Sequence, residues 1–159
     1  MSIKITSLAI ALAFGLAACT NTIPNSGLNT TDQTFPQDSP EFFQASVGDR
    51  VLFEVDQATL NSEAQSILNA QAAWLLQNAE FQTLIEGHAD EQGTREYNLA
   101  LGARRANAVQ EYLISKGVAQ NRLSVVTYGK ERPVEICSTE ACWSKNRRAV
   151  SVVSVGGNS

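Results

Sequence analysis

The sequence predicts an α+β domain built as a two-layer sandwich, in which helices pack on one face of a four-stranded mixed sheet. Three observations lead to this fold class. Along the chain, segments of strand length with alternating apolar residues alternate with segments that have apolar residues at helical spacing. Their order is βαβαβ, then a short helix and a last strand, which favours helices on one face of a single sheet. The chain has 159 residues, enough for one such domain and too few for two independent cores.

The first strand and the first helix open the predicted domain. In RVLFEVD, residues 50–56, apolar residues alternate with others, which predicts a strand that ends at Asp56. Ser62 and Gln65 fit a capping box for the first helix, which we expect to reach about Asn78. The residues expected to face the core are Val51, Phe53 and Val55 in the strand and Leu60, Ala64, Ile67, Leu68 and Leu75 in the helix.

The second strand and the second helix form the central part of the domain. FQTLIEGH, residues 81–88, is predicted as a strand whose end is marked by Gly87. Thr94 is placed to cap the following helix, which we expect to stop at Gly117. One face of this helix combines residues at steps of three and four, namely Asn98, Leu101, Arg105, Ala108 or Val109, and Tyr112.

Two further strands and a short helix complete the domain, which we place at residues 49–155 with a tail at 156–159. RLSVVTYG, residues 122–129, is the third strand, and NRRAVSVVSV, residues 146–155, contains the fourth. The segment between them begins as a Pro-containing loop. It offers two caps for a short helix, Ser138 or Thr139.

The N-terminus has the pattern of a secreted precursor. Residues 1–18 contain one early cation, Lys4, then an apolar run and small residues, and are too short for a membrane span. Leu16-Ala17-Ala18-Cys19 resembles the bacterial lipobox, after which the cysteine becomes the lipidated first residue of the mature chain. The alternatives are an uncleaved apolar anchor and ordinary cleavage after Ala18. Because two or more acyl chains hold a protein firmly in a bilayer, lipid on Cys19 would be a stable anchor, and we expect no other cofactor.

Residues 19–48 are predicted to be the lipidated end and a flexible tether. The segment is rich in Asn, Thr, Ser, Gln and Pro, so it buries too little surface to offset its ordering entropy. Phe42 and Phe43 are the exception and are candidates to pack against the domain. In lipoproteins of this kind an Asp after the lipidated cysteine favours the inner membrane, whereas this chain has Thr20. The lipobox resemblance therefore implies the outer membrane, on its periplasmic face.

Charge and cysteine usage restrict the function. The chain has 12 basic and 16 acidic residues and no basic patch, which argues against nucleic acid as a partner. Cys137 and Cys142 form a C-x4-C pair, and in an oxidising periplasm a structural disulfide is the natural interpretation. A metal site is the weaker alternative, because zinc would need two further ligands and the chain has a single histidine, His88.

Arg105 is the unusual residue in the apolar stripe of the second helix. We expect it at the rim of the core, where a partly desolvated guanidinium needs acceptors and a carboxylate fits its fork best. If the first two strands are parallel, Asp56 and Asp90 lie at the same edge of the sheet, beside the start of this helix. One interpretation is an internal Asp90–Arg105 salt bridge. The other is a cleft for a zwitterion, in which Arg105 takes a carboxylate and an aspartate takes an ammonium group.

Several motifs together resemble the OmpA-like C-terminal domain family. The resemblance covers about residues 50–155, and the lipobox and tether extend it to the lipoproteins of the Tol-Pal system within that family. The matching residues are Gly87-His88-Ala89-Asp90, Gly93, Tyr97-Asn98, Leu101, Arg104-Arg105-Ala106, Val109, Tyr112-Leu113, Ser124, Tyr128-Gly129 and Ser144-Lys145-Asn146-Arg147-Arg148-Ala149-Val150.

The resemblance implies a function, partners and site residues. Members of this family bind peptidoglycan non-covalently by holding the meso-diaminopimelate of the stem peptide, which carries the carboxylates and the ammonium group that such a cleft takes. The matching site positions are Asp56, Asp90, Leu101 and Arg105, and Thr94 and Asn98 are included as their neighbours. The implied partners are peptidoglycan, the outer membrane, and the periplasmic propeller protein and inner-membrane energy-coupling protein of the Tol system. The implied role is in envelope integrity and cell division.

Some positions depart from the family pattern. Gly102 stands where the family motif has Ser, and Val55 stands where these lipoproteins often have Phe. The Cys137 and Cys142 pair is absent from many family members. The first two departures bear on pocket detail, and the cysteine pair bears on local loop geometry.

Two other functions are considered. A hydrolase would use His88, Asp90 and Glu86 or Glu91, but the chain has no nucleophile elbow and no HExxH-like spacing, so we expect no enzyme. We expect His88 to be a hydrogen-bonded structural residue and Arg104 to be solvated. The nearer alternative is a wall-binding lipoprotein of the same family without Tol partners.

Overall fold

The computed structural model describes residues 35–156. The predictions for the signal segment, for Cys19, for the first part of the tether and for residues 157–159 lie outside the described residues. The elements along the described part are α1 (Pro40–Phe42), the π-helix η1 (Phe43–Gly48), β1 (Arg50–Leu52), α2 (Ser62–Gln77), β2 (Phe81–His88), α3 (Arg95–Ser115), the 3-10 helix η2 (Gln120–Arg122), β3 (Leu123–Gly129), α4 (Glu140–Asn146) and β4 (Arg148–Val155). Within residues 35–156, no helix combines the length and the apolar character needed to cross a membrane.

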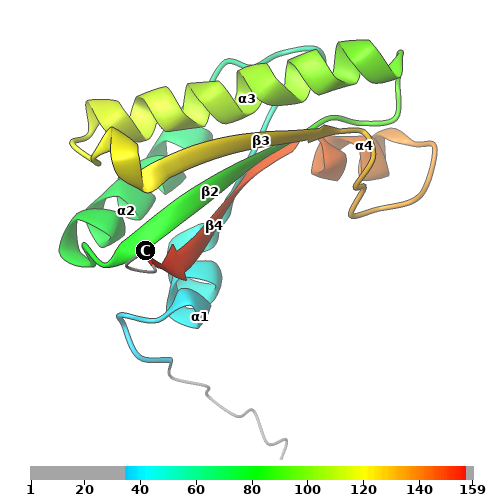
Figure 1. The fold of residues 1–159 in the computed structure, drawn as a ribbon. Coiled ribbons are helices and arrows are strands. Elements are labelled where there is room, and N and C mark those ends of the chain that lie inside the picture. Colours follow the sequence, from blue (N-terminus) through cyan, green and yellow to red (C-terminus); the bar gives the residue numbers. More distant parts are fainter. Residues whose placement is uncertain (1–34, 157–159) are drawn as a thin grey trace, which may run out of the picture. The chain divides into compact units, whose positions relative to one another are not determined.

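The four strands form one mixed sheet in the order β1-β4-β2-β3 (Figure 1). β2 and β3 are parallel and are joined through α3, whereas β4 runs antiparallel to both β2 and β1. Because β1 and β2 are each antiparallel to β4, they run in the same direction. Their carboxyl ends therefore lie at the same edge of the sheet, which is the condition for Asp56 and Asp90 to meet. The predicted α+β fold class is confirmed.

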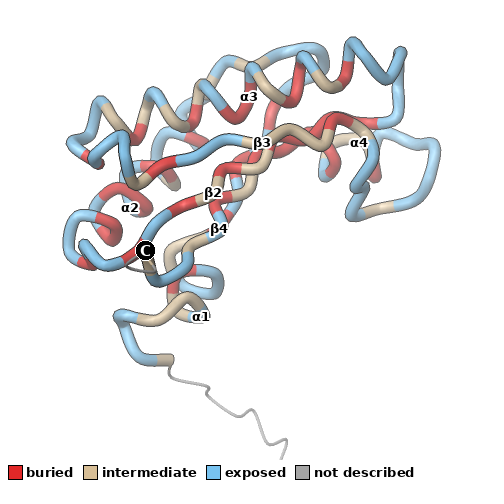
Figure 2. Tube along the Cα trace, in the orientation of Figure 1, coloured by how far each residue is buried: buried red, intermediate tan, exposed pale blue. Residues whose placement is uncertain are grey.

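The core lies between one face of the sheet and the helices α2 and α3. Val51, Ile85 and Ala149 point to this face and are buried, while Leu52 and Val152 on the opposite face are about half exposed. Figure 2 shows the buried positions along the inner sides of these elements. The large buried side chains of the core are Phe43, Phe53, Leu68, Trp74, Leu75, Phe81, Ile85, Val109 and Leu113. Removing such side chains from water is the main contribution that holds the two layers together.

α3 crosses the end of β2 in close contact at Gly87 and Gly102. A Cβ at Gly87 would lie 1.9 Å from the Gly102 carbonyl oxygen, and a Cβ at Gly102 would lie 2.5 Å from Oγ1 of Thr127. The Thr127 hydroxyl donates a hydrogen bond to the Leu99 carbonyl oxygen at 2.9 Å. The space beside position 102, where the family motif has Ser, is therefore filled by the hydroxyl of Thr127. This close crossing brings the first half of α3 over the loop that follows β2.

β1 is shorter than the predicted strand. It ends at Leu52, and Phe53 remains beside the sheet through a hydrogen bond from its N–H to the Arg147 carbonyl oxygen at 2.9 Å. Val55 was expected to face the core but is 54% exposed. The chain turns there, because Asp56 adopts a left-handed conformation with a φ of 58° that no strand residue has. The prediction of a strand up to Asp56 is wrong for its last residues.

The helix starts are predicted correctly for α3 and one residue late for α2. The cap of α2 is Asn61, whose side-chain oxygen accepts a hydrogen bond from the Ala64 N–H at 2.8 Å, so Ser62 is the first helical residue. Asn and Ser are similarly good caps, and two adjacent candidates leave the start undecided by one residue. The predicted cap Thr94 accepts a hydrogen bond from the Tyr97 N–H at 3.2 Å.

Residues 35–48 belong to the folded domain, so the predicted boundary between tether and domain at Asp49 lies too far along the chain. Phe43 is 1% exposed and packs on Trp74, with 4.9 Å between the ring centroids. The indole N–H of Trp74 donates to the Gln37 carbonyl oxygen at 2.7 Å, and Gln71 donates to the Gly48 carbonyl oxygen at 2.7 Å. The expectation that Phe43 packs on the domain is confirmed. The boundary was misplaced because the segment is polar on average, although Phe43 packs into the core.

Candidate functional site

Most of the predicted site residues line one pocket at the edge of the sheet. The pocket has a volume of about 220 Å³ and lies between the turn after β1, the loop after β2 and the first turns of α3. Its lining residues are Val55, Asp56, Asp90, Gln92, Gly93, Tyr97, Asn98 and Leu101. Of the predicted positions, Thr94 and Arg105 do not line it.

Two carboxylates give this pocket its charge. Asp90 is largely buried, and its Oδ1 accepts a hydrogen bond from the Gln92 N–H at 3.2 Å. Asp56 is exposed and sits in the turn after β1, where its left-handed backbone is one that aspartate tolerates better than most residues. A cation in the pocket therefore has two carboxylates near it, one from the turn after β1 and one from the loop after β2.

The loop between β2 and α3 is held in shape by the two predicted residues at the start of α3. Thr94 caps the helix from outside the pocket. Asn98 is buried and donates from Nδ2 to the Gln92 carbonyl oxygen at 2.8 Å. Gly93, with a φ of 87°, makes the turn between Gln92 and Thr94. These contacts fix the loop that carries Asp90.

Arg105 was predicted at the rim of the core. This prediction is wrong, because the exposed fraction of the residue is 0%. Its Nε donates to the Gln57 carbonyl oxygen at 2.8 Å, Nη1 to the His88 carbonyl oxygen at 2.8 Å, and Nη2 to the Glu54 carbonyl oxygen at 3.1 Å. These acceptors belong to the loop after β1 and to the end of β2. Arg105 therefore joins the two walls of the pocket from behind.

The internal Asp90–Arg105 salt bridge considered from the sequence is not formed. Asp90 instead pairs with Arg147, whose Nη1 lies 3.3 Å from Oδ2 of Asp90. Burial lowers the pKa of Arg105 to about 10, and the nearby carboxylates of Asp90 and Asp56 act against that shift. Because a pKa of about 10 keeps the guanidinium charged at neutral pH, Arg105 supplies a fixed positive charge behind the pocket.

Arg147, Gln92 and Tyr97 also belong to this site but were not predicted from the sequence. A signal for Arg147 was present, because two adjacent arginines open the last strand and alternation turns one of them toward the core side, where it needs acceptors. Gln92 and Tyr97 had no such signal. Their place in the pocket follows from the path of the loop and from the crossing of α3 over β2.

His88 lies outside the pocket and is buried. Neither ring nitrogen has a hydrogen-bond partner in the described part of the chain, and the nearest carboxylate oxygen, Oε2 of Glu86, is 3.6 Å from Nε2. The predicted hydrogen bond to the ring is therefore not formed. Burial, together with the charges of Arg148 and Arg132, lowers the pKa of His88 to about 4, so the ring is neutral at pH 7.

The residues of the hydrolase alternative do not converge on this pocket, although His88 and Glu86 are neighbours. Of His88, Asp90, Glu86 and Glu91, only Asp90 lines the pocket. Among residues 35–156 there is also no group of three or more potential metal-ligating side chains. Arg104 is exposed, as predicted, with its guanidinium carbon 5.9 Å from the centroid of the Tyr97 ring.

A larger cavity of about 440 Å³ lies between β1, the start of α2 and the segment around α4. Its lining mixes apolar side chains with the exposed ion pair between Lys145 and Glu135, in which Nζ and Oε1 are 2.9 Å apart. None of the predicted site residues lies in it. Glu63 lines this cavity and is therefore a matched control position for the carboxylates of the smaller pocket.

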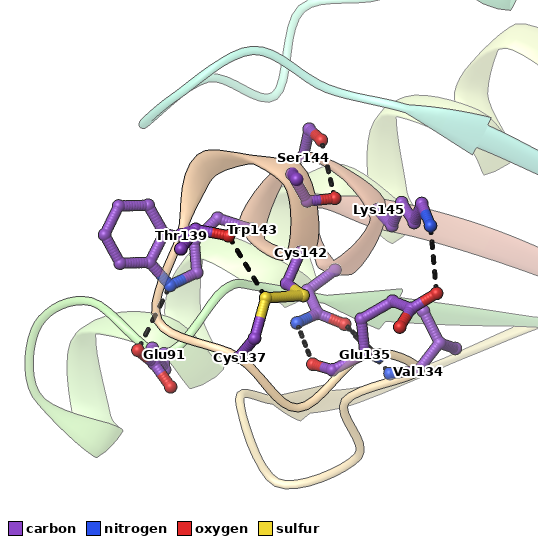
Figure 3. The surroundings of a disulfide bond; sticks show 11 residues. Glu91, Val134, Glu135, Cys137, Thr139, Cys142, Trp143, Ser144 and Lys145 are labelled. Atoms are coloured by element: carbon purple, nitrogen blue, oxygen red, sulfur yellow. Dashed lines mark hydrogen bonds and ion pairs between the residues drawn. A yellow bond between two sulfur atoms is a disulfide. The ribbon is translucent and has the colours of Figure 1, made fainter.

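Cys137 and Cys142 form the predicted disulfide, with their Cα atoms 5.7 Å apart (Figure 3). Thr139, one of the two predicted caps, is the N-cap residue of α4. Its hydroxyl makes no capping bond and lies 3.1 Å from Sγ of Cys137. The disulfide thus ties the loop before α4 to the first turn of that helix.

Comparisons with known proteins agree with this architecture. Residues 52–148 match the OmpA family. The chain is 45% identical over 156 residues to the peptidoglycan-associated lipoprotein of Mesorhizobium japonicum, covering 95% of this chain and 92% of that protein. It is 44% identical over 164 residues to the peptidoglycan-associated lipoprotein of Brucella melitensis, covering 98% and 96%. The crystal structure of the peptidoglycan-associated lipoprotein from Burkholderia pseudomallei matches with a TM-score of 0.69 at 37% identity, covering 73% of this chain and 100% of that one. The chain therefore belongs to the OmpA family and, within it, to the group of the peptidoglycan-associated lipoproteins.

Proposed function

We propose that this chain binds peptidoglycan non-covalently and that its pocket holds the meso-diaminopimelate residue of the stem peptide. The observation that carries the proposal is the convergence of Asp56 and Asp90 on one pocket, in front of the buried charge of Arg105. A diaminopimelate unit presents an ammonium group and carboxylates, and this arrangement of charges is complementary to it. The names of the relatives, which associate them with peptidoglycan, add support.

The ammonium group of the ligand is assigned to Asp56 and Asp90, and a ligand carboxylate is assigned to Arg105. A guanidinium has five N–H groups, of which three donate to backbone carbonyls here, so two on the terminal nitrogens remain. Arg105 has no exposed surface, so the pocket must open toward it before a carboxylate can use them. Thr94 and Asn98 hold the loop, and Leu101 supplies an apolar wall.

The proposal extends to location and partners. The lipobox-like segment before Cys19 supports a lipid anchor, and with Thr20 it supports the periplasmic face of the outer membrane. In this position the domain links membrane and wall, with the periplasmic propeller protein and the inner-membrane energy-coupling protein of the Tol system as partners. Such a link requires no turnover, so the proposed activity is binding and not catalysis.

Sedimentation with purified sacculi tests the site. Asp90→Asn keeps the size and the hydrogen-bond acceptor of the side chain and removes its charge, and Asp56→Asn does the same while tolerating the left-handed backbone. Each variant of the full-length chain should lose most of its sedimentation with sacculi at physiological salt. Glu63→Gln removes one carboxylate from the larger cavity and should sediment like the wild type.

The outcome separates the two cavities. Full sedimentation of both aspartate variants, with their folding checked by circular dichroism, would refute the pocket assignment. Loss of sedimentation in Glu63→Gln alone would move the site to the larger cavity. Crosslinking in cells to the Tol propeller protein distinguishes the proposed role from that of a wall-binding lipoprotein without Tol partners, which would form no such crosslink.

A further inference from the structure

The disulfide segment lies directly against the loop that carries Asp90. We name residues 134–147, which contain the disulfide and α4, the strap. In Figure 3 the indole of Trp143 faces Glu91, and its Nε1 donates to Oε1 of Glu91 at 3.1 Å. Hydrogen bonds from Ser138 and Trp143 keep the pKa of the Glu91 carboxyl below its usual range, so Glu91 is an ionised acceptor at neutral pH. The strap therefore holds the residue next to Asp90.

Arg147, the last residue of the strap, makes a second contact with the same loop. Its buried guanidinium donates from Nη1 to Oδ2 of Asp90 at 3.3 Å. The same group donates to both carboxylate oxygens of Glu140, the first residue of α4. Its Nε donates to the carbonyl oxygen of Phe53, just after β1, at 3.1 Å. One buried cation thus connects Asp90, the chain after β1 and the first turn of α4.

The strap is fixed at both of its ends. At the C-terminal end of α4, the buried Asn146 accepts hydrogen bonds from the N–H groups of Val134 and Glu135 at 2.8 and 3.2 Å and donates to the Glu135 carbonyl oxygen at 2.9 Å. At the other end, the Cys137–Cys142 disulfide holds the first turn of α4. A helix of seven residues is too short to be stable by itself, so its shape depends on these ties.

We infer that the strap, closed by the Cys137–Cys142 disulfide, positions Asp90 for ligand binding, with Trp143 and Arg147 as the positioning residues. This inference rests on the proposed function of the pocket. When the disulfide is open, the first turn of α4 is free to fray, which withdraws Glu140 from Arg147 and Trp143 from Glu91. The loop that carries Asp90 then loses the constraints that the strap supplies and keeps those from the start of α3, so binding has to order it further at a cost in conformational entropy.

The test measures binding curves of the full-length chain, in detergent, on purified sacculi. Cys137→Ser with Cys142→Ser opens the strap, and Trp143→Phe keeps the aromatic ring but removes the donor to Glu91. Each should weaken binding about threefold to tenfold, the range expected for losing one or two hydrogen bonds. Lys145→Ala is the matched control, because it removes an exposed ion pair between α4 and Glu135 without touching the loop that carries Asp90, and it should bind like the wild type.

Two further readouts separate positioning from general stabilisation. Amide hydrogen exchange should rise at residues 89–93 in both variants. In Trp143→Phe, which keeps the disulfide, the midpoint of thermal unfolding should change no more than in Lys145→Ala. Dithiothreitol delivers two electrons and two protons to the disulfide and is itself oxidised to a cyclic disulfide. Treated wild type should bind like the double cysteine variant, which should not respond to the reagent.

The outcomes are distinct for each claim. Equal binding by wild type, reduced wild type and both variants overturns the inference and leaves the proposed function in place. Weaker binding of Trp143→Phe that comes with a lowered midpoint of thermal unfolding and with exchange raised throughout the domain also overturns it, because the strap is then a general stabiliser. No binding by the wild type itself removes the proposed function, and the inference falls with it.

Discussion

At the scale of the residue, Arg105 combines a full charge with complete burial. Its position in the apolar stripe of α3 predicted a partly desolvated cation at the rim of the core, not a fully buried one. Its partners could not be predicted, because they are the backbone carbonyls of residues 54, 57 and 88. Every residue has a backbone carbonyl group, so the residue types in the sequence do not indicate which carbonyls act as acceptors. The consequence for experiment is that replacing Arg105 unpairs three acceptors and destabilises the fold, so the aspartates are the better probes of binding.

Asp56 allows a prediction about backbone strain. A left-handed conformation costs most residues about 1–2 kcal/mol, and Asn and Asp are the side chains that tolerate it best. Asp56→Ala should therefore lower the free energy of unfolding by about 1 kcal/mol more than Asp56→Asn does, as measured by urea denaturation. Equal stability of the two variants would show that the turn relaxes at this position.

The lowered pKa of His88 leads us to expect that stability depends on pH. The pKa of its ring is about 4 in the folded chain, whereas the ordinary value of 6.5 applies to the unfolded chain. Between pH 4 and pH 6.5 the unfolded state therefore binds more protons than the folded state. The free energy of unfolding should be fully retained above pH 6.5 and should fall by on the order of 2–3 kcal/mol as the pH drops to 4. His88→Gln should flatten this part of the curve of unfolding free energy against pH. A wild-type slope that survives in His88→Gln would assign the effect to other groups.

At the scale of the element, the crossing of α3 over β2 sets how the pocket walls meet. Gly102→Ala would place a Cβ 2.5 Å from Oγ1 of Thr127 and 2.8 Å from the Gly87 carbonyl oxygen. We expect the free energy of unfolding to fall by about 1–3 kcal/mol, the usual cost of overpacking. The loss should be smaller in a Thr127→Ala background, where one of the two clashes is absent. Additive effects in this double-mutant cycle would contradict the contact.

The helical segment before β1 also gives a prediction. Phe43→Ala removes a fully buried ring from the core and should lower the free energy of unfolding by about 3–5 kcal/mol, in contrast to Phe42→Ala at a partly buried position. Thermal or urea unfolding measures the difference. If Phe43→Ala unfolds like the wild type, the domain begins at Asp49, as the composition had indicated.

At the scale of the whole molecule, the layers and the element order followed from periodicity, because strong alternation and helical spacing survive in any tertiary context. Asp56, Asp90, Asn98 and Leu101 were brought together by topology, and parallel strand ends made this foreseeable. The Arg147–Asp90 pair was not foreseeable in the same way, since it joins segments 57 residues apart through the position of α4. The turn at Asp56 includes one left-handed residue, which periodicity does not detect.

The central claim, that the pocket between β1, β2 and α3 holds diaminopimelate, is tested most directly by an NMR titration of the chain with a diaminopimelate-containing stem peptide. A stem peptide with lysine in place of diaminopimelate is the control, because it lacks one carboxylate. We expect saturable amide shifts at Asp56, at residues 89–93 and at residues 97–101 with the first peptide, and much weaker binding of the control. Shifts concentrated around Glu63 and Ile67 at the larger cavity, or equal binding of both peptides, would contradict this claim.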